Sequence, residues 1–409
     1  SQLNFSFRAD GRSVERAETV GEGKLTVTSP DPKQGAREVT AGQFVMAFDD
    51  LSRLSSLLGL SGTRMKFHPP AGTPPGIGER ESSSERLDAR FNPVTEALDS
   101  FAQLGSFAYK DGERQASAAR ADYAPQSQLL TLTGHPQVWD SATRTRADRV
   151  LLHLDTYVAE GIDNVQATHI EPGDSGQRAG GAGAGPDPGV APEASSTHVL
   201  ADRVRAERSG QLVHYEGHVR AWHGADVIES AALDYHGSER RLSTPSSVLT
   251  SHLAPAARAP GAPATAGAQP GRATRPLTIR ADHLEFFDQG RKANYRGDVQ
   301  LETESTTMRS DRMDVYFSSA PNAGGSEVER VAADGHVRVT QPQRRAAGDH
   351  ADYEAAAGKI LLKGGPPTLY DEAKGFTTGQ SLTFFTRDDT LSVDGGAQSP
   401  TLSKRRVAQ

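Results

Sequence analysis

Apolar and polar residues alternate in short segments along most of this chain. Val213, Tyr215 and Val219 belong to one such segment, and Val299 and Leu301 belong to another. A period of two is typical of a β-strand with one buried face, because successive side chains point to opposite sides of the strand. Helical spacing is rare. The pattern therefore predicts an all-β protein.

The alternating segments recur as internal repeats. A constant offset of 80 residues aligns Ala201-Asp202 with Ala281-Asp282, Tyr215 with Tyr295, Gly217 with Gly297, and Val219 with Val299. Shorter matches align residues 121–123 with 351–353, 23–27 with 335–339, and 40–43 with 377–380. The last match predicts a strand at residues 44–48, followed by a turn and a second strand within residues 51–60. Such agreement indicates repeated supersecondary units that stack on one another.

Each unit reads as Ala-Asp, an apolar strand, a polar turn, a second strand, and then Gly-x-Val with a third strand. An Asp beside a strand start can hydrogen-bond to nearby backbone and end the preceding turn. A Gly before x-Val permits a bulge where a long strand must bend. Each strand keeps one apolar face, which only a neighbouring unit can bury.

Stretches rich in Pro, Gly, Ala and Ser separate the alternating segments. Such composition is typical of loops and linkers that bury little apolar surface. We predict two β-segments, at residues 1–171 and 197–409, joined by a linker at 172–196. Disordered loops are predicted at residues 69–84 and 254–276.

The repeated segments from Ala201-Asp202 to Val219, from Ala281-Asp282 to Val299, and at residues 332–337 carry a family resemblance. They resemble the OstA/LptA-like family of lipopolysaccharide-transport proteins, most strongly over residues 197–409. The resemblance implies an elongated twisted β-jelly-roll, open along one edge, in the periplasm of a Gram-negative bacterium. It also implies a role in shielding lipid acyl chains. Family members join end to end into a bridge between the inner and outer membranes.

The apolar face of the predicted strands is the candidate lipid-binding groove. Burial of an acyl chain is worth about 0.8 kcal/mol per CH₂ group, so an apolar groove needs no specific polar contact to hold one. The alternative is that these residues form an ordinary closed core. The candidate groove residues are Val213, Tyr215, Val219, Ile279, Phe286, Tyr295, Val299, Leu301, Val315, Phe317, Val337, Val339, Phe384 and Val393.

The ends of a stacked β-structure leave strands without a neighbour, and such strands favour pairing with another chain. We predict edge-strand pairing with homologous transport-bridge proteins, or head-to-tail with a second copy. The candidate ends are residues 5–7 and 382–393. The alternative is a blunted end covered by the basic residues 404–406.

Composition narrows the partners. The formal net charge is −7, which argues against nucleic acid because phosphate binding needs a basic surface. The chain contains no cysteine, so it has neither disulfides nor thiolate metal sites, and no apolar run reaches the roughly 20 residues of a transmembrane helix. We expect an exported, periplasmic protein whose signal or anchor lies upstream of Ser1.

Motifs that suggest catalysis have simpler explanations. The segment 173–176, Gly-Asp-Ser-Gly, resembles a protease nucleophile but lies in the predicted linker, where no oxyanion hole would be held. Residues His214, His218 and His223 lack histidines at the matching repeat positions, so a metal site is not expected. We predict a non-enzymatic protein without a cofactor. The competing interpretations are a β-repeat scaffold and a phospholipid conduit.

Overall fold

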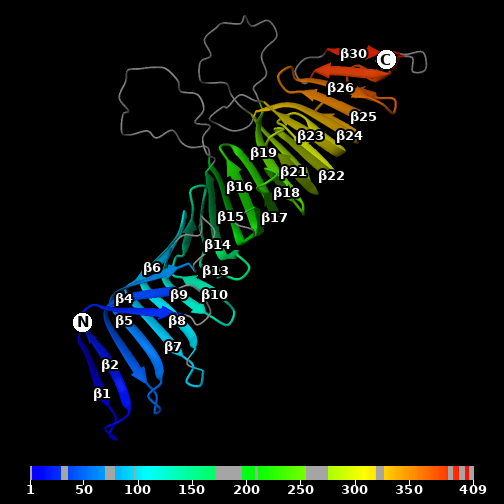
Figure 1. The fold of residues 1–409 in the computed structure, drawn as a ribbon. Helices are drawn as coiled ribbons and strands as arrows, with labels where there is room; N and C mark the ends of the chain where they lie inside the picture. The colour runs from blue at the N-terminus through cyan, green and yellow to red at the C-terminus, as the bar shows by residue number, and fades with distance from the viewer. Residues whose placement is uncertain are drawn as a thin grey trace, which may run out of the picture. The chain divides into compact units, whose positions relative to one another are not determined.

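The computed structural model is an all-β protein, as the alternation predicts (Figure 1). The described part of the chain contains 31 strands and no helix, so it contains no helix that could cross a bilayer. The predicted strand within residues 51–60 is confirmed as part of β5, Leu54–His68. The structure describes residues 2–28, 36–69, 79–95, 97–170, 196–207, 211–254, 275–318, 327–385, 390–395 and 401–404.

The chain forms two compact units. Unit 1 comprises Ser1–Ser196 with Leu200–Ser209, and unit 2 comprises Thr197–Val199 with Gly210–Gln409. Strand β15, Ser196–Glu207, contributes to both. The strands of unit 1 are β1 (Gln2–Phe7), β2 (Val14–Val20), β3 (Gly23–Thr28), β4 (Ala36–Phe48), β5, β6 (Arg80–Ser84), β7 (Arg86–Phe91), β8 (Leu98–Asp111), β9 (Arg114–Ala124), β10 (Leu129–Thr133), β11 (Gln137–Trp139), β12 (Thr143–Arg146), β13 (Arg149–His153) and β14 (Val158–Ile170).

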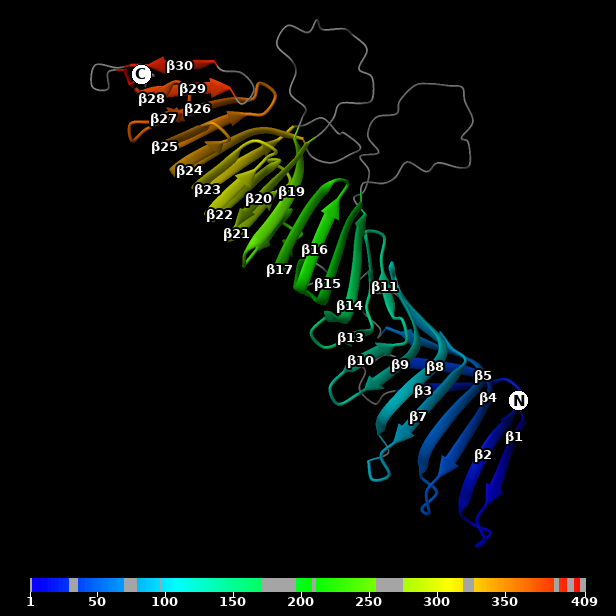
Figure 2. The same cartoon turned by 180° about the vertical axis from the view of Figure 1, so that it is seen from behind.

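The strands of unit 2 follow in the same antiparallel manner (Figure 2). They are β16 (Leu212–His223), β17 (Asp226–His236), β18 (Arg241–Thr244), β19 (Val248–Ala254), β20 (Arg275–Ala281), β21 (His283–Phe287), β22 (Lys292–Glu302), β23 (Thr307–Phe317), β24 (Val328–Gln341), β25 (Arg344–Glu354), β26 (Lys359–Lys363), β27 (Thr368–Asp371), β28 (Gly375–Thr378), β29 (Ser381–Phe385), β30 (Leu391–Asp394) and β31 (Leu402–Lys404).

Strands β17, β22 and β25 of unit 2 have different partners for their two halves, which divides the unit into two layers. Residues 292–296 of β22 pair with β21, whereas residues 300–302 pair with β20. The first layer therefore contains β18, β21, β26, β29 and β30, and the second layer contains β19, β20, β27, β28 and β31. We call the series of crossings between the layers the fold line. At the opposite margin, here called the open margin, turns such as 302–307 and 341–344 join strands within one layer.

A two-residue bulge marks the fold line in the long strands. Gly297 and Asp298 both have positive φ, +79° and +39°, and the register of β22 with β23 shifts between Arg296 and Val299. A side chain at Gly297 would collide with the carboxylate of Asp282, so this position requires glycine. The same pair of positive φ values occurs at 217–218 and 335–336 in unit 2 and at 105–106 in unit 1. The predicted Gly-x-Val bulge is confirmed.

The acidic residue of the Ala-Asp pair contributes to this bulge through its backbone. The N–H of Asp282 donates to the carbonyl of Gly297 at 3.0 Å. In unit 1 a different acidic residue, Glu85 after Ser84, makes the equivalent bond, and its N–H donates to the carbonyl of Gly105 at 2.9 Å. Asp352 instead forms an ion pair with Arg330 on the strand surface. The recurring aspartates thus have structural contacts.

Two predicted loop boundaries are wrong at their ends. Residues 80–84, placed in the loop 69–84, form strand β6, which pairs with β5 and β8. Ser82 and Ser84 face inward, and the segment contains no apolar residue. The loop 254–276 is shortened by β19, which ends at Ala254, and by β20, which begins at Arg275. Most of the linker 172–196 and the Gly-Asp-Ser-Gly segment lie outside the described residues, so the division into 1–171 and 197–409 stays a prediction.

Candidate functional site

The interior of unit 2 is lined by apolar side chains that stand in register from strand to strand. In the first layer one row runs through cross-strand partners, and a second row runs beside it. The first row is Leu284, Tyr295, Met313, Ala333, Ala351, Leu362, Leu382 and Val393. The second is Phe286, Ala293, Val315, Val331, Tyr353, Ile360, Phe384 and Leu391. Because every cross-strand pair is in register, the rows form continuous apolar tracks.

The second layer supplies a facing row. It runs through Thr250, Ile279, Leu301, Met308, Val339, Ala346, Leu369 and Thr377. Thr250 and Ile279 are fully buried, and Leu301 is 2% exposed. The two layers thus enclose an apolar interior in which side chains of both layers pack in one cluster.

All fourteen candidate groove residues face this interior or its extension through β16. Twelve are buried, and Phe286 and Val393 are partly buried against the core cluster. Their inward orientation follows from the period-two pattern. Their contact with lipid stays a prediction.

A polar network lies within the apolar interior. The Tyr295 hydroxyl is 2.8 Å from Thr250 Oγ1 and 3.2 Å from His252 Nε2, and His252 Nδ1 is 3.0 Å from Asp226 Oδ1. Burial raises the pKa of Tyr295 well above its usual value, which keeps the hydroxyl protonated. Sequence analysis missed Thr250, His252 and Asp226. The available signal was that Thr250 and His252 occupy alternate positions after Val248, as inward residues do.

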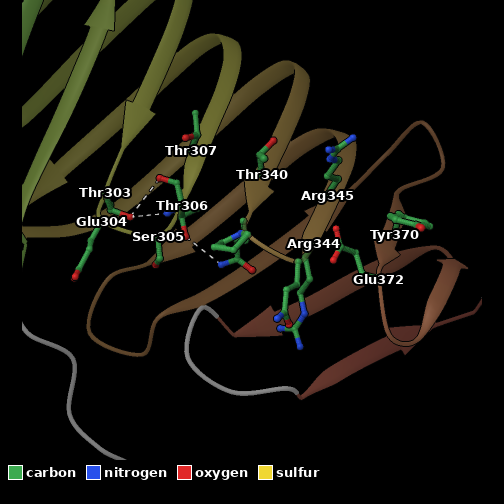
Figure 3. A pocket seen from close by; sticks show the side chains of 13 residues that line it. Thr303, Glu304, Ser305, Thr306, Thr307, Thr340, Arg344, Arg345, Tyr370 and Glu372 are labelled. Carbon is green, nitrogen blue, oxygen red and sulfur yellow. Dashed lines mark hydrogen bonds between the residues drawn. The ribbon is translucent and has the colours of Figure 1, made fainter.

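A polar hollow of about 600 Å³ lies at the open margin of the second layer (Figure 3). The turns at 303–307 and 340–345 line it together with Tyr370 and Glu372. Arg344 Nε donates to Asp371 Oδ2 at 2.9 Å. Although burial opposes the change, hydrogen bonds from Arg344 and from two backbone N–H groups hold the pKa of Asp371 below its usual range. The hollow therefore presents polar groups beside an apolar interior.

The histidines considered as metal ligands are engaged separately. His214 Nδ1 lies 2.5 Å from Asp234 Oδ1, and His223 Nδ1 lies 3.3 Å from Thr197 Oγ1. Within the described residues no group of three or more metal-ligating side chains occurs.

One of the two predicted edge segments is confirmed as an edge strand, and the other is an edge only in part. Strand β1 pairs with β2 alone among the described strands, and Leu3, Phe5 and Phe7 are 44%, 51% and 55% exposed. The segment 382–393 is not an edge as a whole, because β29 pairs with both β26 and β30. The inward side chains of β29 belong to the interior rows. Among the described strands β30 pairs only with β29, so β30 is the edge strand of this segment. Residues 405 and 406 of the proposed basic cover lie outside the described residues.

Part of unit 2 is similar to known proteins. Residues 278–390 match the family described as "LptA/(LptD N-terminal domain) LPS transport protein", a range that contains β21 to β29. An uncharacterized protein of Rhizobium meliloti (strain 1021) is 25% identical over 111 residues, which are 26% of this chain and 59% of that protein. The chain thus spans less than two thirds of the length of this relative.

A solved structure is also similar. It is the crystal structure of LptH, described as the LptA homologous periplasmic component of the conserved lipopolysaccharide transport device from Pseudomonas aeruginosa. The identity is 19%, the TM-score is 0.27, and the match covers 33% of this chain and 96% of that one. The predicted resemblance to the OstA/LptA-like family is confirmed, and its family match spans residues 278–390.

Proposed function

We propose that this chain, which carries an LptA/LptD N-terminal-like segment of the lipopolysaccharide-transport family at residues 278–390, binds lipopolysaccharide in the periplasm and forms part of an inner-to-outer-membrane bridge. The observation that supports this most is the set of registered apolar rows between two layers in unit 2. An acyl chain lying along a row meets similar surface at each strand. It gains about 0.8 kcal/mol per buried CH₂ group without a specific contact.

Lipid entry requires the layers to part at the open margin. In unit 2 the crossings between layers lie on the fold line, so separation at the opposite margin breaks no strand pairing. The side chains of the two layers would exchange contacts with each other for contacts with hydrocarbon, which are similar in strength. A polar headgroup would lie at the margin, where the hollow beside Arg344 and Arg345 offers hydrogen-bond partners.

Assembly would use the edge strands. The exposed Leu3, Phe5 and Phe7 on β1 continue the interior face, since their partners Thr19, Ala17 and Val14 belong to a strand that buries Ala17 to 1% exposure. Pairing of β1 with an edge strand such as β30 of a second copy, or with a homologous jelly-roll, would cover these side chains and satisfy their backbone groups.

The test is photocrosslinking from the interior in cells that produce the full chain. A photoreactive amino acid at Val299, 0% exposed, should crosslink to lipopolysaccharide. The matched control is Arg309, which is exposed on the neighbouring strand β23. Crosslinks to phospholipid alone would favour a phospholipid conduit. Absence of any lipid crosslink from Val299, or equal yields from both positions, would favour a scaffold and contradict the proposal.

A further inference from the structure

The network centred on Tyr295 joins the two layers of unit 2 through the interior. Tyr295 belongs to β22 in the first layer, and Thr250 and His252 belong to β19 in the second. Its hydroxyl therefore exchanges hydrogen bonds across the space in which the proposed function places an acyl chain. We call these residues, with Asp226, the Tyr295 network.

The network is enclosed by apolar side chains. Tyr295 and Thr250 are fully buried and His252 is 6% exposed. The ring of Phe317 lies 5.0 Å from that of His252, centroid to centroid, and Leu284 and Met313 flank Tyr295 in its row. The polar atoms of Tyr295, Thr250 and His252 thus form an island between apolar tracks, and the network ends at the partly buried Asp226.

The hydrogen-bond roles within the island are complementary. An imidazole whose Nδ1–H donates to the carboxylate of Asp226 presents Nε2 as an acceptor. The Tyr295 hydroxyl can then donate to His252 and accept from Thr250. In the closed interior the three side chains satisfy one another.

Parting the layers separates the Tyr295 hydroxyl from Thr250 Oγ1 and His252 Nε2. A buried polar group that loses its hydrogen bond costs about 1–3 kcal/mol. A plain hydrocarbon chain between Tyr295 and β19 offers no replacement, whereas a chain that carries a hydroxyl group can both donate and accept at that point.

From this asymmetry we propose that the Tyr295 network is an interior subsite for a hydroxyl-bearing acyl chain. The inference rests on the proposed function and adds the chemical class of chain that unit 2 prefers. Tyr295 and Thr250 are the groups that contact the hydroxyl, and Asp226 is a positioning residue that orients His252.

The experiment compares 3-hydroxymyristate with myristate as competitors for a fluorescent fatty acid, cis-parinaric acid, bound to the full chain. The wild-type protein should bind the hydroxylated chain about 5- to 10-fold more tightly, as expected for one net hydrogen bond. Tyr295→Phe should bring the ratio close to one. Tyr109→Phe is the matched control, because it removes a tyrosine hydroxyl in unit 1 that bonds to Asp111, and it should keep the wild-type ratio.

Equal affinities in the wild-type protein, or an unchanged preference in Tyr295→Phe, would overturn the subsite while leaving lipid binding intact. If neither fatty acid displaces the probe from wild-type protein, the proposed function fails and the subsite fails with it. Thermal unfolding checks that each variant folds. If Tyr295→Phe does not fold, Thr250→Val provides the same test from the second layer, and retention of the preference there also overturns the inference.

Discussion

The two units share one strand plan but have different interiors. In unit 2 the inward rows are apolar apart from the Tyr295 network and a few hydroxyl groups. In unit 1 strand β6 turns Ser82 and Ser84 inward, and Ser84 Oγ lies 2.6 Å from Thr63 Oγ1. Gln103 Nε2 donates to the same Ser84 hydroxyl at 3.3 Å. Unit 1 thus contains a hydroxyl-lined patch where unit 2 contains aliphatic side chains.

This difference shows that the backbone framework, meaning the paired strands and their bulges, does not depend on one kind of inward side chain. We call the inward side chains the filling. Both units bend their long strands with the same positive-φ pair, at Gly105-Ser106 and at Gly297-Asp298. Backbone pairing and these bulges set the layers, so the inward side chains are free to vary with what the interior must contact. The following experiments test how separable framework and filling are.

The largest loss of stability is expected from a substitution that creates a cavity in the apolar interior. Leu362→Ala, at a side chain that is 0% exposed, should destabilise unit 2 by about 2–5 kcal/mol. Hydrogen–deuterium exchange should rise in the strands of unit 2 and stay unchanged in unit 1. Leu132→Ala, at an equally buried position of β10, is the reciprocal control in unit 1. A rise across both units in either variant would contradict the expectation that each unit opens without the other.

The fold line should respond next. Gly297→Ala forces a side chain into positive φ and against Asp282, which should cost about 1–3 kcal/mol. Gly105→Ala should cost a similar amount in unit 1, where the added carbon meets Glu85. Gly290→Ala is the control, because its added carbon meets nothing nearer than 4.0 Å. Chemical denaturation measures all three, and equal effects at 290 and 297 would count against the bulge as a shared framework element.

The hydroxyl-lined patch of unit 1 offers a paired test on one strand. Ser84→Ala removes the partner of Thr63 and Gln103 and should destabilise by about 1 kcal/mol. Ser82→Ala should be close to neutral or slightly stabilising, because the buried Ser82 hydroxyl has no hydrogen-bond partner among the described residues. Thermal unfolding compares them. A larger loss at Ser82 than at Ser84 would contradict this prediction.

The smallest effect concerns surface charge in unit 2. Burial alone would lower the pKa of His350. Hydrogen bonds to Asp334 and Asp352 outweigh burial and raise this pKa above its usual value. The stabilisation is therefore complete below about pH 6.5 and is lost as the pH rises through the folded-state pKa. Asp352, whose pKa is lowered chiefly by Arg330 and His350 against the effect of burial, contributes above about pH 4 and loses its effect as the pH falls through its own folded-state pKa.

The wild-type advantage over His350→Gln should thus be larger at about pH 5 than at about pH 8, by less than about 1 kcal/mol because the pair is partly exposed. Exchange in β24 and β25 measures it, and exchange in unit 1 is the internal control. An advantage that grows toward pH 8 would contradict the assignment.

Sequence predicted the strands, the bulges and the inward faces because each depends on neighbours in the chain. It missed β6 because a strand made of Arg, Glu and Ser carries no apolar alternation. It missed the Tyr295 network because β19 places Thr250 inward and leaves the more apolar Leu249 on the other face. The hydrogen bond between Tyr295 and Thr250 joins residues 45 positions apart in different layers, and no local pattern encodes it.

The registered pairing of unit 2 has a mechanical corollary. The long strands β16, β22 and β24 each contain a glycine step, and backbone hydrogen bonds tie β22 and β24 to neighbouring strands such as β23 and β25. A wedge inserted at one strand would tilt its neighbours partway and leave distant strands shut. Under the proposed function, only the strands beside the lipid would need to part at any moment, so the unit would never expose its whole interior to water at one time.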